Sequence, residues 1–282
     1  MRHARFWRGL ARSSARSPAP YRRSRLPSRH DSRYRGLPQS ARSRLLIRDL
    51  TILIPAYNES RRIQVTLDKV FAYAKKRFET LDVIVVDDGS DDGMGAFIAQ
   101  TYGDRVRVVR QPERRGKGAA IRRGVTEVRT TWMLFCDADL SIPLEEIEAF
   151  EPHTDRVPIV IGSKRAPGSH VEYPKVRRFL GGIGQSLVSL FVVSGFHDTQ
   201  AGFKLYRTDV ARRLFAAQTI DGFGFDFEVL YLAKRLGYDV AEVPIHCEHK
   251  IGGTVRFSTY LTVLKEIATV VWNRVRGAYP KS

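Results

Sequence analysis

From about residue 50 onward, short apolar runs rich in β-forming residues alternate with segments of helical periodicity. Strands are expected at residues 51–55, 81–87, 105–110, 132–137 and 158–163, with helices at 63–78, 92–102, 118–128 and 144–150 between them. This alternation favours a mostly parallel central sheet with helices on both faces, which is an α/β fold. In such sheets ligands bind at the carboxyl ends of the strands. Polar residues follow the first, second and fourth expected strands, at that edge of the sheet.

The remainder of the chain is less regular. Strands are expected at residues 203–207 and 239–245, and helices at 176–193, 227–236 and 259–274. We expect a single domain over residues 50–282, with halves at 50–163 and 164–282. The last helix is amphipathic, and one side carries Leu261, Leu264, Ile267, Ala268, Val271 and Val275. That side either packs on the core or lies on a membrane surface.

The formal net charge of +17 would usually indicate a phosphate-rich partner, but it is unevenly distributed. Residues 1–50 carry 14 Arg and only two acids, whereas the rest of the chain has a net charge of only +5. Residues 1–49 are rich in Arg, Ser and Pro without hydrophobic periodicity, so we expect a disordered tail. It could tether the protein to anionic lipid, bind nucleic acid, act as a transit peptide, or precede the true translation start. The folded part lacks an aromatic and basic recognition motif, so no nucleic-acid partner is expected.

Cysteine usage and hydrophobic run length exclude two further classes of protein. Cys136 and Cys247 are the only cysteines, which excludes a disulfide scaffold or a Cys-rich zinc module and fits a reducing compartment. The best candidate for a membrane span, residues 187–196, contains two Ser and a Gly and is far shorter than the roughly 18 apolar residues that span a bilayer. We therefore expect a protein that lies on a membrane, if it meets one, rather than crossing it.

The acidic residues that follow the expected strands suit a divalent metal. Asp137 and Asp139 end an apolar strand, so in an extended backbone both carboxylates would point to the same side. Asp87 and Asp88 follow another strand at the same edge. Hard oxygen ligands of this kind suit Mg²⁺ or Mn²⁺ bridging a diphosphate.

A glycine-rich basic turn precedes one of the expected helices. Gly116 and Gly118 flank Lys117, an arrangement in which backbone N–H groups at a helix start can approach a phosphate. The spacing is neither that of a P-loop nor that of a dinucleotide fingerprint. Taken alone, a simple basic turn is the alternative.

Together these motifs resemble those of family 2 glycosyltransferases. The motifs that carry the resemblance are IPAYNE (54–59), VVDDGS (85–90), RGKG (115–118), DAD (137–139), GSKR (162–165), DTQAGFK (198–204) and GFDFE (224–228). Over residues 50–257 the chain is similar to polyprenyl-phosphate hexosyltransferases, and among them to the dolichyl-phosphate β-glucosyltransferase type.

The resemblance implies a glycosyltransferase-A fold with a nucleotide-binding half at 50–163 and an acceptor half at 164–282. It implies a role in binding the nucleotide-sugar for Pro55, Tyr57, Glu59, Asp87, Asp88, Lys117, Asp137 and Gln200. Asp137 and Asp139 would hold the metal. Asp226, Glu228 and Asp139 would form the catalytic group, with Asp226 and Glu228 orienting the donor sugar or the nucleophile. Helix N-capping is the alternative role for Asp226.

The implied reaction is an inverting transfer of a hexose to a polyprenyl or dolichyl phosphate. Glucose from UDP-glucose is favoured, and mannose from GDP-mannose is the alternative. An anionic acceptor needs cations, for which the candidates are Lys164, Arg165, Arg177, Arg178 and Lys250. We expect the enzyme on the cytoplasmic face of a membrane, reaching lipid from the surface or through a membrane-protein partner. A nucleic-acid-binding protein and a catalytically inactive scaffold are the less favoured classes.

Overall fold

The computed structural model describes residues 47–74, 77–171, 175–248 and 257–281. Of the tail expected at residues 1–49, positions 1–46 lie outside the described residues. Ile47 is fully buried and the first strand begins at Asp49, so the fold starts slightly before the boundary expected at residue 50.

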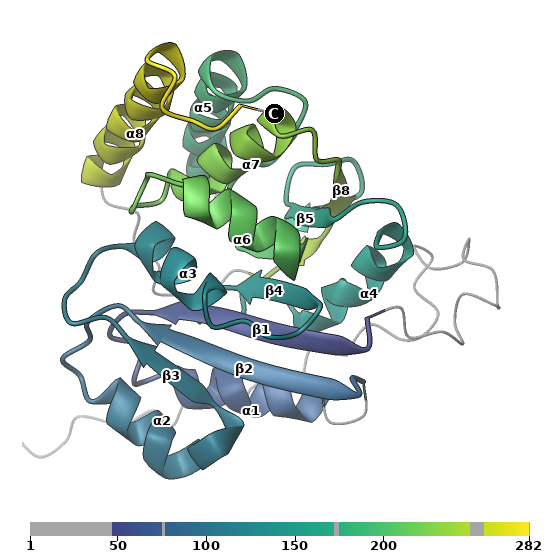
Figure 1. Ribbon diagram of the computed structural model, residues 1–282, viewed down its shortest axis with the longest axis vertical. Helices are drawn as coiled ribbons and strands as arrows, with labels where there is room; N and C mark the ends of the chain where they lie inside the picture. The colour runs from purple at the N-terminus through teal and green to yellow at the C-terminus, as the bar shows by residue number, and fades with distance from the viewer. Residues whose placement is uncertain (1–46, 75–76, 172–174, 249–256, 282) are drawn as a thin grey trace, which may run out of the picture. The chain divides into compact units, whose positions relative to one another are not determined.

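In the described part of the chain, seven strands form one sheet in the order β3-β2-β1-β4-β7-β5-β8 (Figure 1). Their bounds are β1 Asp49–Ala56, β2 Thr80–Asp87, β3 Arg107–Arg110, β4 Trp132–Cys136, β5 Ile159–Ser163, β7 Phe203–Arg207 and β8 Val240–Pro244. Neighbouring strands are parallel except at β7, which is antiparallel to both β4 and β5. The mostly parallel sheet is thus confirmed. β6 (His170–Val171) and β9 (His246–Cys247) form a separate parallel pair.

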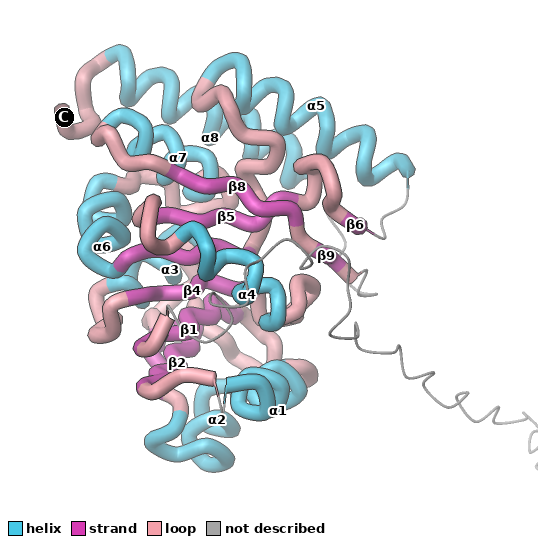
Figure 2. Tube along the Cα trace, turned by 90° about the vertical axis from the view of Figure 1, so that its right-hand side faces the viewer, coloured by secondary structure: helices cyan, strands magenta, loops and turns pink. Residues whose placement is uncertain are grey.

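Helices cover both faces of the sheet, as expected. Their bounds are α1 Ile63–Ala74, α2 Met94–Tyr102, α3 Lys117–Val125, α4 Ile147–Phe150, α5 Lys175–Phe191, α6 Thr208–Ala217, α7 Phe225–Arg235 and α8 Phe257–Val275, with 3-10 turns η3 Gly103–Arg105, η4 Leu144–Glu146 and η5 Glu151–His153. Side chains alternate along each strand, so Ile52 and Ile54 pack toward α1, α2 and α4, whereas Leu53 packs toward α3 and α7. Figure 2 shows α1 and α2 on one side and α6, α7 and α8 on the other.

Helix α6 is an element that the sequence analysis did not predict. Val210, Ala211, Leu214 and Phe215 pack into the core on one side of it. The helix begins directly after β7 without a glycine or proline to mark the boundary, and Arg212 and Arg213 lie on its exposed side. The strand that precedes it, β7, lies between β4 and β5, so the two expected halves of the domain share one sheet.

Helices α5 and α8 pack against each other, and both carry exposed apolar side chains. In α8 the core side consists of Glu266, Ile267, Val270 and Asn273. Most of the apolar side expected from the sequence faces away from the core, and Leu261, Leu264 and Val275 are exposed. None of the helices in the described ranges is long and apolar enough to cross a bilayer.

Candidate active site

The loops after β1, β2 and β4 meet at the carboxyl edge of the sheet. After β1, Tyr57 is half-buried and the Arg114 guanidinium lies 4.3 Å from the centroid of its ring. Glu59 follows, with Oε2 at 2.8 Å from Arg62 Nε. Burial raises the pKa of Glu59 against the effect of Arg62, and the charges of Asp139 and Asp137 raise it further. Pro55, by contrast, is buried within β1. It lies two residues before Tyr57, near the end of the strand from which the loop departs.

The two acids at the end of β2 are also buried, and both accept hydrogen bonds from neighbouring loops. Asp87 is fully buried, and its Oδ1 accepts a hydrogen bond from Ser90 N at 2.8 Å. Asp88 accepts from Gln111 Nε2 at 2.6 Å, Arg115 N at 2.9 Å and Gly116 N at 2.8 Å. Both carboxylates therefore fix the loops that border the site, and Asp88 holds the glycine-rich turn through its backbone.

Asp137 and Asp139 lie beyond the end of β4 rather than in it. Leu140 N donates to Asp137 O at 3.0 Å and Leu140 has a φ of 44°, so the segment is a turn and not extended backbone. The expectation that strand alternation places both carboxylates on one side is therefore wrong. Both are half-buried, and a Cβ at Gly202 would overlap Asp137 Oδ2. Gly202 thus lets β7 approach the acidic turn closely.

Lys117 begins α3 and reaches the acidic turn. Its Nζ lies 2.6 Å from Asp137 Oδ1 and 4.9 Å from the centroid of the Phe135 ring. Burial alone would lower the pKa of Lys117, but the nearby carboxylates of Asp137, Asp226 and Asp139 raise it. One cation therefore faces three acids that come from two separate segments of the chain.

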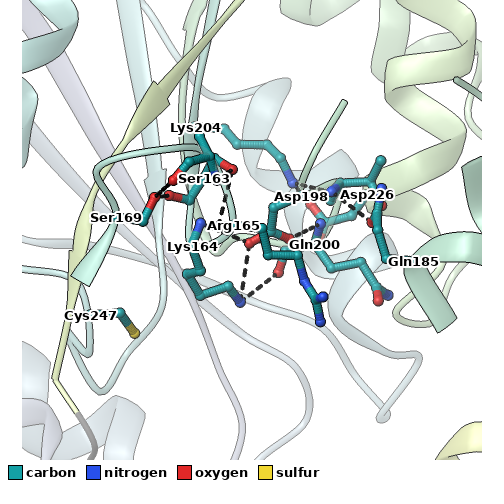
Figure 3. A network of polar contacts seen from close by, with 12 residues as sticks. Ser163, Lys164, Arg165, Ser169, Gln185, Asp198, Gln200, Lys204, Asp226 and Cys247 are labelled. Carbon is teal, nitrogen blue, oxygen red and sulfur yellow. Dashed lines mark hydrogen bonds and ion pairs between the residues drawn. The ribbon is translucent and has the colours of Figure 1, made fainter. Parts of the chain in front are cut away.

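Asp226 lies in the first turn of α7 and is nearly fully buried. Its Oδ1 forms an ion pair with Nζ of Lys204, which is itself completely buried on β7 (Figure 3). Burial raises the pKa of Asp226, while Lys204 and Lys117 act in the opposite direction. The N-cap of α7 is Gly224, without a side-chain cap, so the capping role considered for Asp226 is not observed.

Glu228 does not belong to this group of acids. It is fully buried, and its oxygens accept hydrogen bonds from Thr219 N at 3.0 Å, Ile220 N at 2.8 Å and Tyr279 Oη at 2.7 Å. All of these donors belong to the 218–220 loop and to the end of the chain. The structure therefore corrects the catalytic role expected of Glu228, because its carboxylate is used to hold α7, this loop and the C-terminal residues together.

The expected acceptor cations are described only in part. Lys164 Nζ lies 3.8 Å from Asp198 Oδ2 and 3.5 Å from Gln200 O, and the Arg165 side chain is exposed nearby (Figure 3). Gln200 is half-buried, and its backbone N–H donates to Asp198 Oδ1 at 3.0 Å. Arg177 and Arg178 belong to α5, but their side chains lie outside the described residues, as does Lys250.

Two features of the site were not predicted. The first is Lys204, which ends the DTQAGFK motif but was given no role in the site. The second is the 218–224 loop, where Asp221 pairs with Arg115 and Arg122. Its backbone carbonyls accept from Gly118 N at 3.3 Å and Ala119 N at 3.1 Å, so it supports the turn that carries Lys117.

Comparison with known proteins identifies the family of this chain. The family model described as glycosyl transferase family 2 matches residues 51–215, which is more than half of the chain. The chain belongs to this family. A dolichyl-phosphate beta-glucosyltransferase from Mus musculus is 33% identical over 255 residues, covering 82% of this chain and 78% of the mouse protein.

Solved structures of other glycosyltransferases share the fold of this family 2 member. Mannosyl-3-phosphoglycerate synthase from Rubrobacter xylanophilus matches with a TM-score of 0.61 at 19% identity, covering 83% of this chain and 77% of that one. Glucosyl-3-phosphoglycerate synthase from Mycobacterium tuberculosis, in complex with Mn²⁺, UDP-glucose and phosphoglyceric acid, matches with a TM-score of 0.59 at 19% identity, covering 83% and 81%. These likenesses confirm the glycosyltransferase-A fold expected from the sequence.

Proposed function

We propose that the chain transfers glucose from UDP-glucose to dolichyl phosphate or a related polyprenyl phosphate, with inversion to a β-linked product. The observation that carries this proposal is the likeness to dolichyl-phosphate beta-glucosyltransferases over most of the chain. The position of Asp137, Asp139, Lys117 and Asp226 around one edge of the sheet supports it, because a nucleotide-sugar needs groups for its diphosphate and for its sugar.

Asp137 and Asp139 fit Mg²⁺ or Mn²⁺, and we assign the metal to them. A small divalent cation is commonly held by one or two carboxylates together with substrate phosphates and water. Phosphate oxygens of the donor and water would complete the ligand set around these two carboxylates. When bound, the metal neutralises charge that develops on the departing diphosphate.

The remaining donor contacts come from side chains of the chain itself. Lys117 is placed to bind the diphosphate, and its flexible stem allows the ammonium to move from Asp137 to a phosphate oxygen. Asp226 orients the donor sugar. Tyr57 and Glu59 border the nucleoside, and Gln200 borders the sugar.

The acceptor is its own nucleophile in this reaction. A phosphate monoester has a second pKa of roughly 6, so it is largely dianionic at neutral pH and needs no strong general base. Lys164 and Arg165 are placed to receive it, and Arg177, Arg178 and Lys250 remain candidates for the same task. Because the nucleophile attacks opposite the leaving diphosphate, a single displacement converts the α-linked donor into a β-linked product.

We further propose that α5 and α8 rest on the membrane that holds the acceptor. Their exposed apolar side chains form what we call the apolar surface, which consists of Ile183, Leu190, Phe191, Leu261, Leu264, Trp272 and Val275. An amphipathic helix can bury such side chains at the boundary between headgroups and acyl chains. The use of only two cysteines in the whole sequence, Cys136 and Cys247, fits the reducing cytoplasmic side. The Arg-rich N-terminal residues would add attraction to anionic lipid.

The test is an incubation of the full chain with a short-chain polyprenyl phosphate, Mg²⁺ or Mn²⁺, and either UDP-glucose or GDP-mannose. We expect a lipid-phosphate-hexose by mass spectrometry from UDP-glucose, with a β-anomeric coupling by NMR. A product formed only from GDP-mannose would overturn the sugar assignment. No product from any nucleotide-sugar in a wider panel would overturn the proposed function.

A further inference from the structure

Lys204 is a cation in the middle of the sheet, with no part of its side chain exposed. It lies on β7, where the strand register places it beside Phe135 on β4 and Ile161 on β5. Moving an ammonium group out of water is costly unless the charge is paired and hydrogen-bonded. A completely buried lysine at this position therefore requires a specific partner.

Lys204 has two such partners, and both border the donor site. Its Nζ pairs with Asp226 Oδ1 in the first turn of α7 and donates to Thr199 O at 3.0 Å. Thr199 lies between Asp198 and Gln200. In the same loop, the Asp198 carboxylate accepts hydrogen bonds from the backbone N–H groups of Lys164 and Gln200. One ammonium group thus joins the central sheet, this loop and the start of α7 (Figure 3).

Stability alone does not explain this pair. A buried ion pair is often no more stabilising than two well-packed apolar side chains of similar volume, which the surrounding aromatic core could accommodate. Phe135 and Tyr206 are both buried in the same core. Other charges face the pair, because Lys117 and Asp137 act on Asp226, and Asp198 acts on Lys204. The pair therefore belongs to the group of charged residues at the site and is not an isolated ion pair in the core.

We propose that Lys204 is a positioning residue, which holds the Asp226 carboxyl group in a fixed orientation toward the donor sugar. This inference rests on the proposed function, in which Asp226 acts on the donor sugar. Burial opposes ionisation of Asp226, and Lys204 supplies the main opposing charge. Without Lys204 the carboxyl group would take up a proton or turn toward solvent, and in either case the sugar would lose its fixed contact.

The experiment compares Lys204→Met, Asp226→Asn and the double variant with the unmodified full chain. Tyr206→Phe is the matched control, since Tyr206 lies two residues further along β7 and is equally buried. Thermal unfolding and UDP binding by calorimetry are measured first, because neither requires transfer. We expect Lys204→Met to lower the Tm by several degrees, and the double variant to recover most of that loss because it leaves no unpaired buried charge. An unchanged Tm for Lys204→Met, or no recovery in the double variant, would show that the two groups are not coupled.

Kinetics then separate positioning from a merely structural role. With UDP affinity unchanged, we expect Lys204→Met to lower kcat by about 100-fold with little change in KM for UDP-glucose, because orientation rather than nucleotide binding is lost. The double variant should be no slower than Asp226→Asn alone. A folded Lys204→Met protein with normal kcat, or a double variant much slower than Asp226→Asn, would overturn the inference. Failure of the proposed function would instead appear as a lack of transfer by the unmodified chain.

Discussion

Lys117 Nζ lies 2.6 Å from Asp137 Oδ1, although the two residues belong to different βα connections. Lys117 begins α3 after β3, and Asp137 follows β4. The contact places a cation and a proposed metal ligand side by side at the carboxyl edge of the sheet. The positive charge of Lys117 reduces the mutual repulsion of the acids at this site.

Lys117→Met should weaken the binding of UDP by about tenfold or more, because a charge-assisted contact to phosphate is lost. Calorimetry with UDP and Mn²⁺ measures this directly. The matched control is Lys69→Met, an exposed lysine of α1. If Lys117→Met and Lys69→Met bind UDP as tightly as the unmodified chain, Lys117 does not contact the diphosphate.

Asp139→Ala should abolish metal-dependent transfer while the protein stays folded, because a carboxylate ligand is lost from a half-buried turn. Transfer is measured across a Mn²⁺ titration, and folding by circular dichroism. Asp155→Ala, at an exposed residue outside the site, serves as the control. Retained activity at ordinary Mn²⁺ concentration would remove Asp139 from the metal site.

Gly202→Ala should displace the carboxylate of Asp137, because the added Cβ would overlap Asp137 Oδ2. We expect the affinity for Mn²⁺ and UDP together to fall at least tenfold, equivalent to about 1.4 kcal/mol. Gly184→Ala is the matched control, since a Cβ there meets nothing within 4 Å. Equal binding by both variants would mean that the turn around Asp137 adapts freely.

Glu228→Leu should destabilise the protein by about 3 kcal/mol, because it leaves the Thr219, Ile220 and Tyr279 donors without an acceptor. Chemical denaturation measures the free energy of unfolding. Tyr279→Phe removes only one of these hydrogen bonds and should cost about 1 kcal/mol. A Glu228→Leu protein that is as stable as the unmodified chain yet inactive would restore the catalytic role that the structure denies to Glu228.

Replacing Leu261, Leu264 and Trp272 together by Ser should reduce co-sedimentation with anionic vesicles, because these side chains supply much of the apolar surface. Transfer to a short, water-soluble acceptor should be unaffected. Val65→Ser, at an exposed apolar residue of α1, is the control. Undiminished vesicle binding by the triple variant would exclude α8 from membrane contact.

Much of the architecture could be predicted from the sequence because its signals are local. The strands before Tyr57, Asp87 and Asp137 are short apolar runs, and the carboxyl ends of parallel strands lie along one edge whatever their order. Helix α6 was missed because its start lacks a boundary residue. The antiparallel insertion of β7 between β4 and β5 depends on pairing between segments far apart in the chain, which periodicity does not report.

By itself, the sequence determined the α/β class, the edge of the sheet that carries the chemistry, and the family, since motif order and hydrophobic period are properties of the chain alone. The tertiary structure decided how each acid is buried and paired. Asp87, Asp88 and Glu228 are used for internal hydrogen bonds, whereas Asp137 and Asp139 are half-buried in a turn. It also revealed the buried ion pair between Lys204 and Asp226. Burial and pairing arise only when distant segments pack together, so identical residue types acquire different roles that no local pattern distinguishes.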